Sequence, residues 1–468
     1  MNFLTEFNNI YQYVLTKTMT IPILERIVMP TKEMKVPELS VIFLIPIKIA
    51  EIDKGTIDLE KIIRRFKKQS NKIEDNVIPI EIKEEDYVDL SEDLKIFYDS
   101  DIEFFDETYL ELKRFVRIDL CDFTLSLVKN GKKRKVTVKP YLTVFEVGIA
   151  VYTFWIVGLK DLTKSDVIDL CFLNKAQIKT ESGQTTTVLS FIKQELREII
   201  DPELKLVDQE IIENHLTMLF IKDFHCEVEC LPDDFVNIYK NELFDLLCLP
   251  ERYYGTTYDF HASRTTGYVD KILENISVRN DFPVFLFDNR FLGIKIRTEK
   301  PDYGFNKRVI FNVVLYTNVI FQLMLIKEIN DALSNITEQL KKVTLGRVIK
   351  LRQSIYRNLE EYINTTIQRI EIWKMAMHDA SKQLKVPELF SAVKERLNML
   401  DSYLGTTFQR QTNVLFVILN TIFFLGTLLA FIEFFLAGEI QLVKFIWFVS
   451  IAILCSALII VYYRRFFR

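Results

Sequence analysis

Two long apolar runs lie almost back to back near the C-terminal end of the sequence, at residues 414–437 and 441–463. Each run is longer than the roughly 20 residues that a helix needs to cross a hydrocarbon core about 30 Å thick. Only Gly438, Glu439 and Ile440 separate the two runs, so their helices are expected to be antiparallel neighbours. The sequence therefore predicts an integral membrane protein with a C-terminal hairpin of two transmembrane helices.

The residues that flank this hairpin predict its orientation. Arg410 precedes the first run, and three arginines follow the second, at Arg464, Arg465 and Arg468. Because the cytoplasmic flanks of membrane spans are enriched in Lys and Arg, both ends of the hairpin are expected in the cytoplasm. The N-terminal segment lacks the basic start and continuous apolar core of a signal peptide. We therefore expect a multi-pass protein of the plasma (inner) membrane with both termini cytoplasmic.

The composition excludes several classes of protein. With 49% hydrophobic and 26% charged residues, the chain is too apolar for a disordered protein and too charged for a polytopic transporter. The formal net charge of −4 argues against nucleic acid as a direct partner. The sequence contains no phosphate-binding glycine loop, zinc-protease motif or nucleophile elbow. We therefore expect neither an enzyme nor a covalently bound cofactor.

Residues 1–307 have the pattern of a mixed α/β domain. Strand-like stretches, rich in β-branched and aromatic residues, occur at 39–49, 123–128, 136–147, 149–157, 284–287 and 291–296. Asn130 and Gly131 lie between two of these stretches and predict a hairpin turn. Helical periodicity occurs at 59–69, 188–200 and 268–276. We therefore predict a cytoplasmic domain of the α+β or α/β class, which is the candidate for ligand sensing.

A third apolar run, Val309–Ile326, is also hydrophobic enough to suggest a membrane span. Its polar residues are distributed around the helix rather than gathered on one face, at Asn312, Thr317, Asn318 and Gln322. A third span would also place the N-terminal domain, which has no signal peptide, outside the cell. We therefore predict that this helix is buried inside the soluble part of the protein.

The sequence changes character after about residue 308. Gly and Pro become rare, and helical periodicity extends to about residue 342 and again from 346 to 383. Pro387 then begins a stretch without further proline that reaches Gly438. A single helix over this stretch would be about 75 Å long at roughly 1.5 Å per residue. We predict a helical stalk at 308–412 and a transmembrane pore domain at 413–468.

The predicted long helix carries two stripes of side chains on different faces. The apolar seam, spaced by three and four residues as in a coiled coil, consists of Phe390, Val393, Leu397, Leu400 and Leu404. The polar stripe, spaced by seven residues, consists of Thr406, Asn413, Asn420 and Thr427. Around a central axis, copies of the polar stripe would form rings of amide and hydroxyl groups that replace part of an ion's hydration shell. Hydrogen bonding between packed helices is the alternative role.

Carboxylates lie at the outer end of the predicted hairpin. Glu433 falls in the outer part of the first run, where it would pair with Lys444 or reach the membrane surface. Glu439 follows Gly438 in the turn, and a ring of Glu439 side chains in an oligomer would attract cations. We predict that Glu433, Gly438 and Glu439 form the outer mouth of a pore. A solvated turn residue is the alternative for Glu439, and the sequence identifies no metal-ligand set.

Two loops and one acidic stretch are candidates for ligand binding in the predicted cytoplasmic domain. One loop region combines aromatic, hydroxyl and guanidinium groups that suit a nucleotide base and a phosphate, at Tyr254, Thr257, Arg264 and Thr265. The basic loop 129–135 suits an anion, and the acidic stretch 84–107 suits a divalent cation. An ordinary solvated surface is the alternative for each.

The order of these segments resembles the CorA-like metal-ion transporter superfamily. The shared features are an α/β domain, two helices before a very long helix that becomes the first span, a short outer turn, and a second span that ends in basic residues. The resemblance is most specific after residue 308. It implies a homopentamer in which Asn413, Asn420 and Thr427 face the pore. It also implies that Arg464, Arg465 and Arg468 form a basic ring around the inner end of that pore.

The chain departs from the family pattern at the outer end of the first run. The family's Gly-Met-Asn signature is absent from residues 430–439. The resemblance therefore does not imply ordinary Mg²⁺ uptake, although Mg²⁺ or another divalent cation stays a candidate ion. Divergent CorA-like proteins also occur as accessory effectors of type III CRISPR antiviral defence. Resemblance to that branch implies a channel opened by a nucleotide second messenger, such as an S-adenosylmethionine–AMP conjugate.

Three functions therefore stay open. The first is a homo-oligomeric CorA-like channel gated by its cytoplasmic domain. The second is a divergent divalent-cation transporter of the Mg²⁺ type. The third is a membrane-tethered sensor or enzyme whose hairpin serves only as an anchor. Replacement of Asn413 and Asn420 by leucine would distinguish the first function from the third. A channel would lose conductance, whereas an anchor would keep working because it needs no polar stripe.

Overall fold

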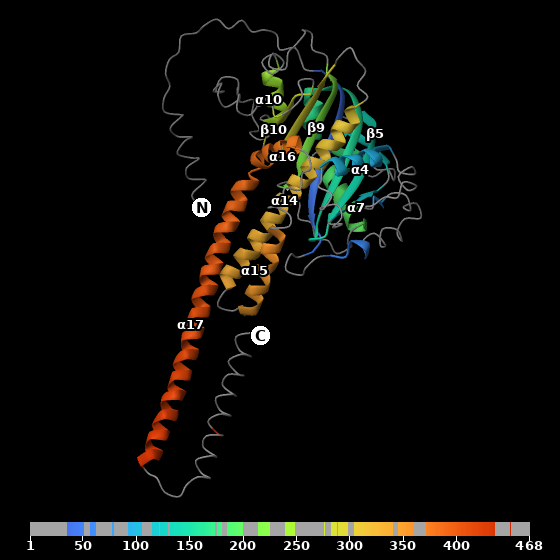
Figure 1. Cartoon of the computed structure of the whole chain (residues 1–468). Coiled ribbons are helices and arrows are strands. Elements are labelled where there is room, and N and C mark those ends of the chain that lie inside the picture. Colours follow the sequence, from blue (N-terminus) through green and yellow to red (C-terminus); the bar gives the residue numbers. More distant parts are fainter. Residues whose placement is uncertain are drawn as a thin grey trace, which may run out of the picture. The chain divides into compact units, whose positions relative to one another are not determined.

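A mixed β-sheet forms the centre of the computed structural model (Figure 1). The structure describes residues 35–50, 57–61, 77–78, 92–104, 115–120, 122–129, 132–173, 176–179, 185–199, 214–224, 239–248, 276, 282–287, 289–297, 304–339, 345–359, 371–435 and 450. All of these residues belong to one unit, Lys35–Arg468.

The described part of the sheet has 11 strands in the order β10-β11-β9-β1-β6-β5-β4-β7-β8, with β3 joined to β5 and β2 joined to β3. β9 and β11 are parallel, whereas the other neighbouring strands are antiparallel. The strand bounds are β1 Lys35–Lys48, β2 Val77–Ile78, β3 Phe115–Asp119, β4 Phe123–Lys129, β5 Lys132–Phe145, β6 Ile149–Thr163, β7 Gln177–Lys179, β8 Thr185–Thr187, β9 Leu216–Phe224, β10 Val284–Phe287 and β11 Arg290–Ile296.

The strands predicted from the sequence are confirmed, because they correspond to β1, β4, β5, β6, β10 and β11. Lys129 of β4 pairs with Lys132 of β5, so a hairpin turns at residues 130–131 as predicted. The two turn residues themselves lie outside the described part of the chain. The central strand β9 was not predicted, although it pairs with both β1 and β11 and is almost wholly buried.

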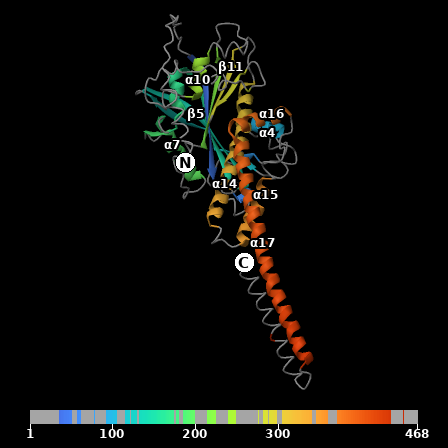
Figure 2. The same cartoon turned by 90° about the vertical axis from the view of Figure 1, so that its left-hand side faces the viewer.

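Helices cover both faces of the sheet (Figure 2). On one face lie α4 Glu92–Phe104 and α14 Phe305–Gln339, and on the other lie α6 Lys164–Leu170, α7 Val188–Ile199 and α10 Lys240–Cys248. Alternation along β6 explains the two layers. Trp155 joins the hydrophobic cluster of α14, whereas the ring of Phe154 lies 6.3 Å from that of Phe191 in α7. The predicted helix 188–200 is confirmed, whereas 59–69 and 268–276 lie almost wholly outside the described residues.

Helix α14 is buried in the core of the described part of the protein. Phe321 stacks on Phe145 of β5 with ring centroids 3.8 Å apart, and Tyr316 meets Phe291 of β11 at 5.0 Å. Of the most apolar stretch of α14, 89% is buried inside the protein. The prediction that Val309–Ile326 is a buried helix is therefore confirmed, and its polar residues Asn312 and Asn318 donate side-chain hydrogen bonds to carbonyls of the preceding turn.

The acidic stretch 84–107 contains a helix whose acidic face is partly buried. Asp101 of α4 is 5% exposed and pairs with Arg117 of β3, which is 1% exposed. Nη2 and Nε of Arg117 donate to the two carboxylate oxygens at 2.9 and 3.3 Å, and Nη1 donates to Thr143 Oγ1 at 2.9 Å. Burial raises the pKa of the Asp101 carboxyl, and Arg117 opposes this rise. This part of the stretch is therefore core rather than a solvated surface.

The helices after α14 are α15 Leu345–Leu359, α16 Glu371–Gln383 and α17 Val386–Phe435. Between α16 and α17, Lys385 has a φ of 58°, a left-handed conformation that ends the first helix. Pro387 occupies the first turn of α17, where its missing N–H leaves no intrahelical bond unmade. The predicted break and the predicted long helix are therefore confirmed as far as Phe435. Of the second apolar run, only Ser450 lies in the described part.

Replacement of Gly148 by alanine is expected to destabilise the sheet domain by about 1–3 kcal/mol. Gly148 has a φ of 84° in the β5–β6 turn, and an added Cβ would lie 2.8 Å from Ala50 Cβ. Gly158 is the matched control, because its φ is 67° but an added Cβ would meet no atom within 4 Å. Gly148→Ala should therefore lower the thermal unfolding midpoint of the full chain more than Gly158→Ala. Equal shifts would show that the contact with Ala50 has no effect.

Candidate functional site

The first half of α17 packs against the rest of the protein through the apolar seam. Val393, Leu397 and Leu400 are each no more than 4% exposed and belong to the same hydrophobic cluster as α14. Phe390 and Leu404, at the ends of the seam, are partly buried against this cluster. The predicted seam is therefore confirmed as a buried stripe, and its packing partner is α14 of the same chain, with α16 also in contact.

The second half of α17 has few neighbours in the described part of the chain (Figure 1). Two described helices are long and apolar enough to cross a membrane, α14 and α17. None of the most apolar stretch of α17 is buried, in contrast to that of α14. Phe423 and Phe424 are 74% and 66% exposed. A continuous exposed apolar surface of this kind is typical of a helix that meets lipid or other protein.

The polar stripe lies on this exposed half of α17. All four of its residues are exposed. Thr406 Oγ1 donates to Ser402 O at 2.8 Å and Thr427 Oγ1 donates to Phe423 O at 2.6 Å, so their hydroxyl protons are used within the helix. Each hydroxyl oxygen still has acceptor capacity. The carboxamides of Asn413 and Asn420 have no hydrogen-bond partner among the described residues, and can bind water, an ion or a neighbouring helix.

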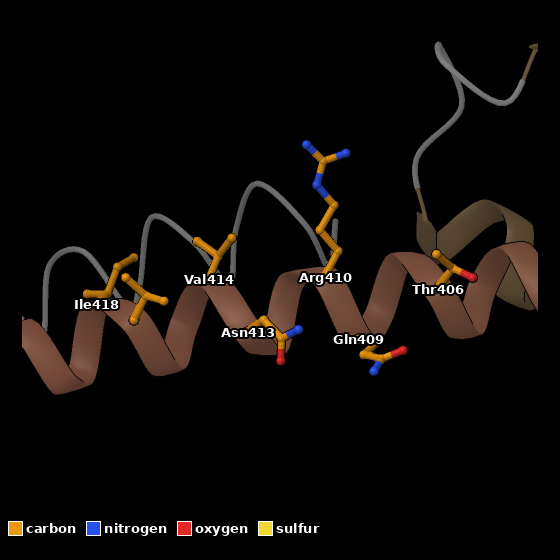
Figure 3. Close-up of a pocket in the computed structure, with 7 residues that line it drawn as sticks. Thr406, Gln409, Arg410, Asn413, Val414 and Ile418 are labelled. Atoms are coloured by element: carbon orange, nitrogen blue, oxygen red, sulfur yellow. The ribbon is translucent and has the colours of Figure 1, made fainter.

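An open hollow of about 460 Å³ marks the boundary between polar and apolar residues on α17 (Figure 3). It is lined by Thr406, Gln409, Arg410, Asn413, Val414, Val417 and Ile418. Arg410, Val414 and Ile418 extend from one side of the helix, whereas Gln409 and Asn413 extend from another. Residues 411–432 carry no charged side chain. Arg410 is therefore the last charge before the exposed apolar stretch, as expected for a residue at a membrane boundary.

Two polar contacts supplement the apolar seam at the point where α17 leaves its neighbours. In the first, Nη1 of Arg396 in α17 donates to Asn330 O at 3.4 Å and to Ser334 Oγ, both in α14. In the second, which we call the Asp401 clamp, Arg352 and Tyr356 of α15 both donate to the carboxylate of Asp401 in α17. The hydrogen bonds from Arg352 lower the pKa of Asp401, so the carboxylate is charged at neutral pH.

The Asp401 clamp was not predicted from the sequence. Arg352 and Tyr356 stand four residues apart on α15 and therefore share one helix face. That spacing was a detectable signal, but nothing in the sequence relates this face to Asp401, which lies 45 residues or more away.

The remaining predicted site residues are not brought together by the described part of the structure. Glu433 lies within α17, but the surroundings of its side chain are not described. Outside the described residues lie Gly438, Glu439, Arg464, Arg465, Arg468, Tyr254, Thr257, Arg264 and Thr265. In the described part, no group of three or more His, Cys, Asp or Glu side chains is placed to hold a metal ion.

No protein-family model matches the chain, no curated protein is significantly similar to it, and no solved structure matches its fold.

Proposed function

We propose that this protein is the subunit of a homo-oligomeric membrane channel, similar in plan to the CorA-like superfamily. The C-terminal helices cross the plasma membrane, α17 lines the pore, and ions pass along the polar stripe. The observation that carries the proposal is the continuity of α17 from a buried seam to an exposed apolar stretch whose two carboxamides have no hydrogen-bond partner among the described residues. A helix that served only as an anchor would not need Asn413 and Asn420, because amides are costly in lipid unless they face water or protein.

The same helix offers a route by which the sheet domain controls the pore. The apolar seam joins α17 to α14, and α14 packs on the central strands β1, β6 and β9. A ligand that binds differently to two arrangements of the sheet domain would shift the position of α17. We propose a nucleotide second messenger as that ligand, which places the channel in antiviral defence, and Mg²⁺ or another divalent cation as an ion that passes.

The experiment that tests this function is current recorded from purified full-length protein in planar bilayers. Divalent-cation current is measured with and without candidate nucleotides, including an S-adenosylmethionine–AMP conjugate. Asn420→Leu is expected to lower unitary conductance at least about tenfold. One leucine from each subunit would replace the ring of amide groups that substitutes for the ion's hydration water.

The neighbouring variant Thr421→Leu is the matched control. Thr421 is exposed on the same stretch, its hydroxyl donates to Val417 O at 2.7 Å, and it lies off the polar stripe. Conductance should survive this substitution. Absence of current from folded, oligomeric wild-type protein would disprove the channel and favour an anchor. Metal uptake without measurable current would favour a divalent-cation transporter.

A further inference from the structure

The Asp401 clamp lies at the point where α17 leaves the rest of the described protein. On one side of Asp401 the apolar seam is buried up to Leu400, and beyond Leu404 the side chains of α17 are mostly exposed. Asn413 is 12 residues further along, or about 18 Å at roughly 1.5 Å per residue. A small change in the tilt or rotation of α17 at Asp401 therefore displaces the whole polar stripe.

The hydrogen bonds of the clamp fix how α17 is rotated about its own axis relative to α15. Arg352 uses Nε for Asp401 Oδ1 and Nη2 for Oδ2, the latter at 3.3 Å, and Tyr356 donates its hydroxyl to Oδ2 at 2.9 Å. The guanidinium carbon also lies 5.1 Å from the centroid of the Tyr356 ring, which holds the two donors together. Apolar contacts along the seam are not directional, whereas a two-point bond to a carboxylate is.

Burial distinguishes this clamp from the pair that Arg117 forms with Asp101. The Arg117 and Asp101 side chains are 1% and 7% exposed, so their pair can separate only if the domain opens. The Arg352 and Asp401 side chains are 39% and 29% exposed. Water can replace each partner there, and an exposed pair of this kind contributes only a small free energy because solvent screens it. The clamp can therefore break and re-form while the domain stays folded.

We propose that the Asp401 clamp is a latch that holds α17 in the resting position of the channel and breaks when the channel opens. This inference rests on the proposed function for its effect on current, but the position of α17 can be measured without current. Asp401→Asn keeps the shape of the side chain and removes its charge. It is expected to raise the resting open probability about two- to fivefold, the range that the loss of one exposed ion pair allows.

The test uses full-length protein with two readouts. The first is single-channel recording, in which Asp401→Asn should change open probability but leave unitary conductance unaltered. The second is the distance between spin labels at Gln353 of α15 and Asn398 of α17, both exposed, in protein whose accessible cysteines are replaced by serine. This distance distribution should broaden in Asp401→Asn. The charge-exchanged pair Arg352→Asp with Asp401→Arg should restore a narrow distribution.

Glu395→Gln is the matched control, because Glu395 is an exposed carboxylate of α17 with no ion pair among the described residues. It should alter neither readout. An unchanged distance distribution in Asp401→Asn would overturn the latch, whatever the current does. A broadened distribution with unchanged open probability would also overturn it, because α17 would then move without effect on the pore. A broadened distribution with no current in any variant would disprove the channel but leave the clamp as the contact that positions α17.

Discussion

Replacement of Arg117 by methionine is expected to destabilise the protein by about 3–5 kcal/mol, because a buried carboxylate loses its partner. Asp101 would keep its buried position but lose the two hydrogen bonds from the guanidinium, and Thr143 would lose a third. The cation–π contact, in which the guanidinium carbon of Arg117 lies 4.6 Å from the centroid of the Phe97 ring, would also be lost. The midpoint of thermal unfolding should fall by about 10 °C, given 2–4 °C per kcal/mol for a domain of this size.

Two further variants test the cause of this loss. Arg197→Met removes an exposed arginine of α7 and should change stability by less than about 0.5 kcal/mol. Arg117→Met combined with Asp101→Leu removes both charges and should recover much of the loss, because an apolar pair in the same space leaves no unpaired charge. If the double variant is as unstable as Arg117→Met alone, packing of the arginine rather than its charge stabilises α4 on the sheet.

Leu397→Ala is expected to cost about 2–5 kcal/mol, the usual range for a buried leucine that leaves a cavity. Leu397 is 2% exposed in the middle of the apolar seam, between Val393 and Leu400. The loss should be local, because the sheet and α14 retain their own core. Hydrogen exchange on the full chain should therefore quicken in residues 386–404 and stay slow in β1 and β6.

Met399→Ala is the control for the seam variant. Met399 lies two residues further along the same helix but is 61% exposed, so its truncation should leave exchange in α17 unchanged within error. Faster exchange throughout the sheet in Leu397→Ala would show that the seam stabilises the whole domain rather than the attachment of α17. In either case the result measures how tightly the first half of α17 is coupled to α14.

Local sequence patterns were enough to identify most elements of the fold. Alternating and continuous apolar runs predicted six strands, and periodicity with one proline predicted both the start of α17 and its unbroken course to Phe435. These features follow from the geometry of single elements, whose side-chain period depends only on neighbours along the chain. For the same reason the polar stripe could be identified on α17, although its role stays a prediction.

The acidic helix α4 shows where local reasoning fails. Leu94, Phe97 and Phe104 recur at helical spacing, but the surrounding acidic residues suggested a divalent-cation site or a solvated surface. Whether Asp101 is solvated or buried depends on a partner 16 residues away on another element. A charge is stable inside a protein only when such a partner is in place.

The sequence by itself predicted six of the 11 described strands, the helix at 188–200, the buried apolar helix α14 and the long helix α17 with its apolar seam, but not α4, α6 or α10. The tertiary structure decided which partners those elements have. It paired the seam with α14, Asp101 with Arg117, and Asp401 with two donors of α15. It also distinguished two helices of similar apolar character, because 89% of the most apolar stretch of α14 is buried and none of that of α17 is. The physical reason is that periodicity is local, whereas burial and ion pairing depend on residues that only the folded chain brings together.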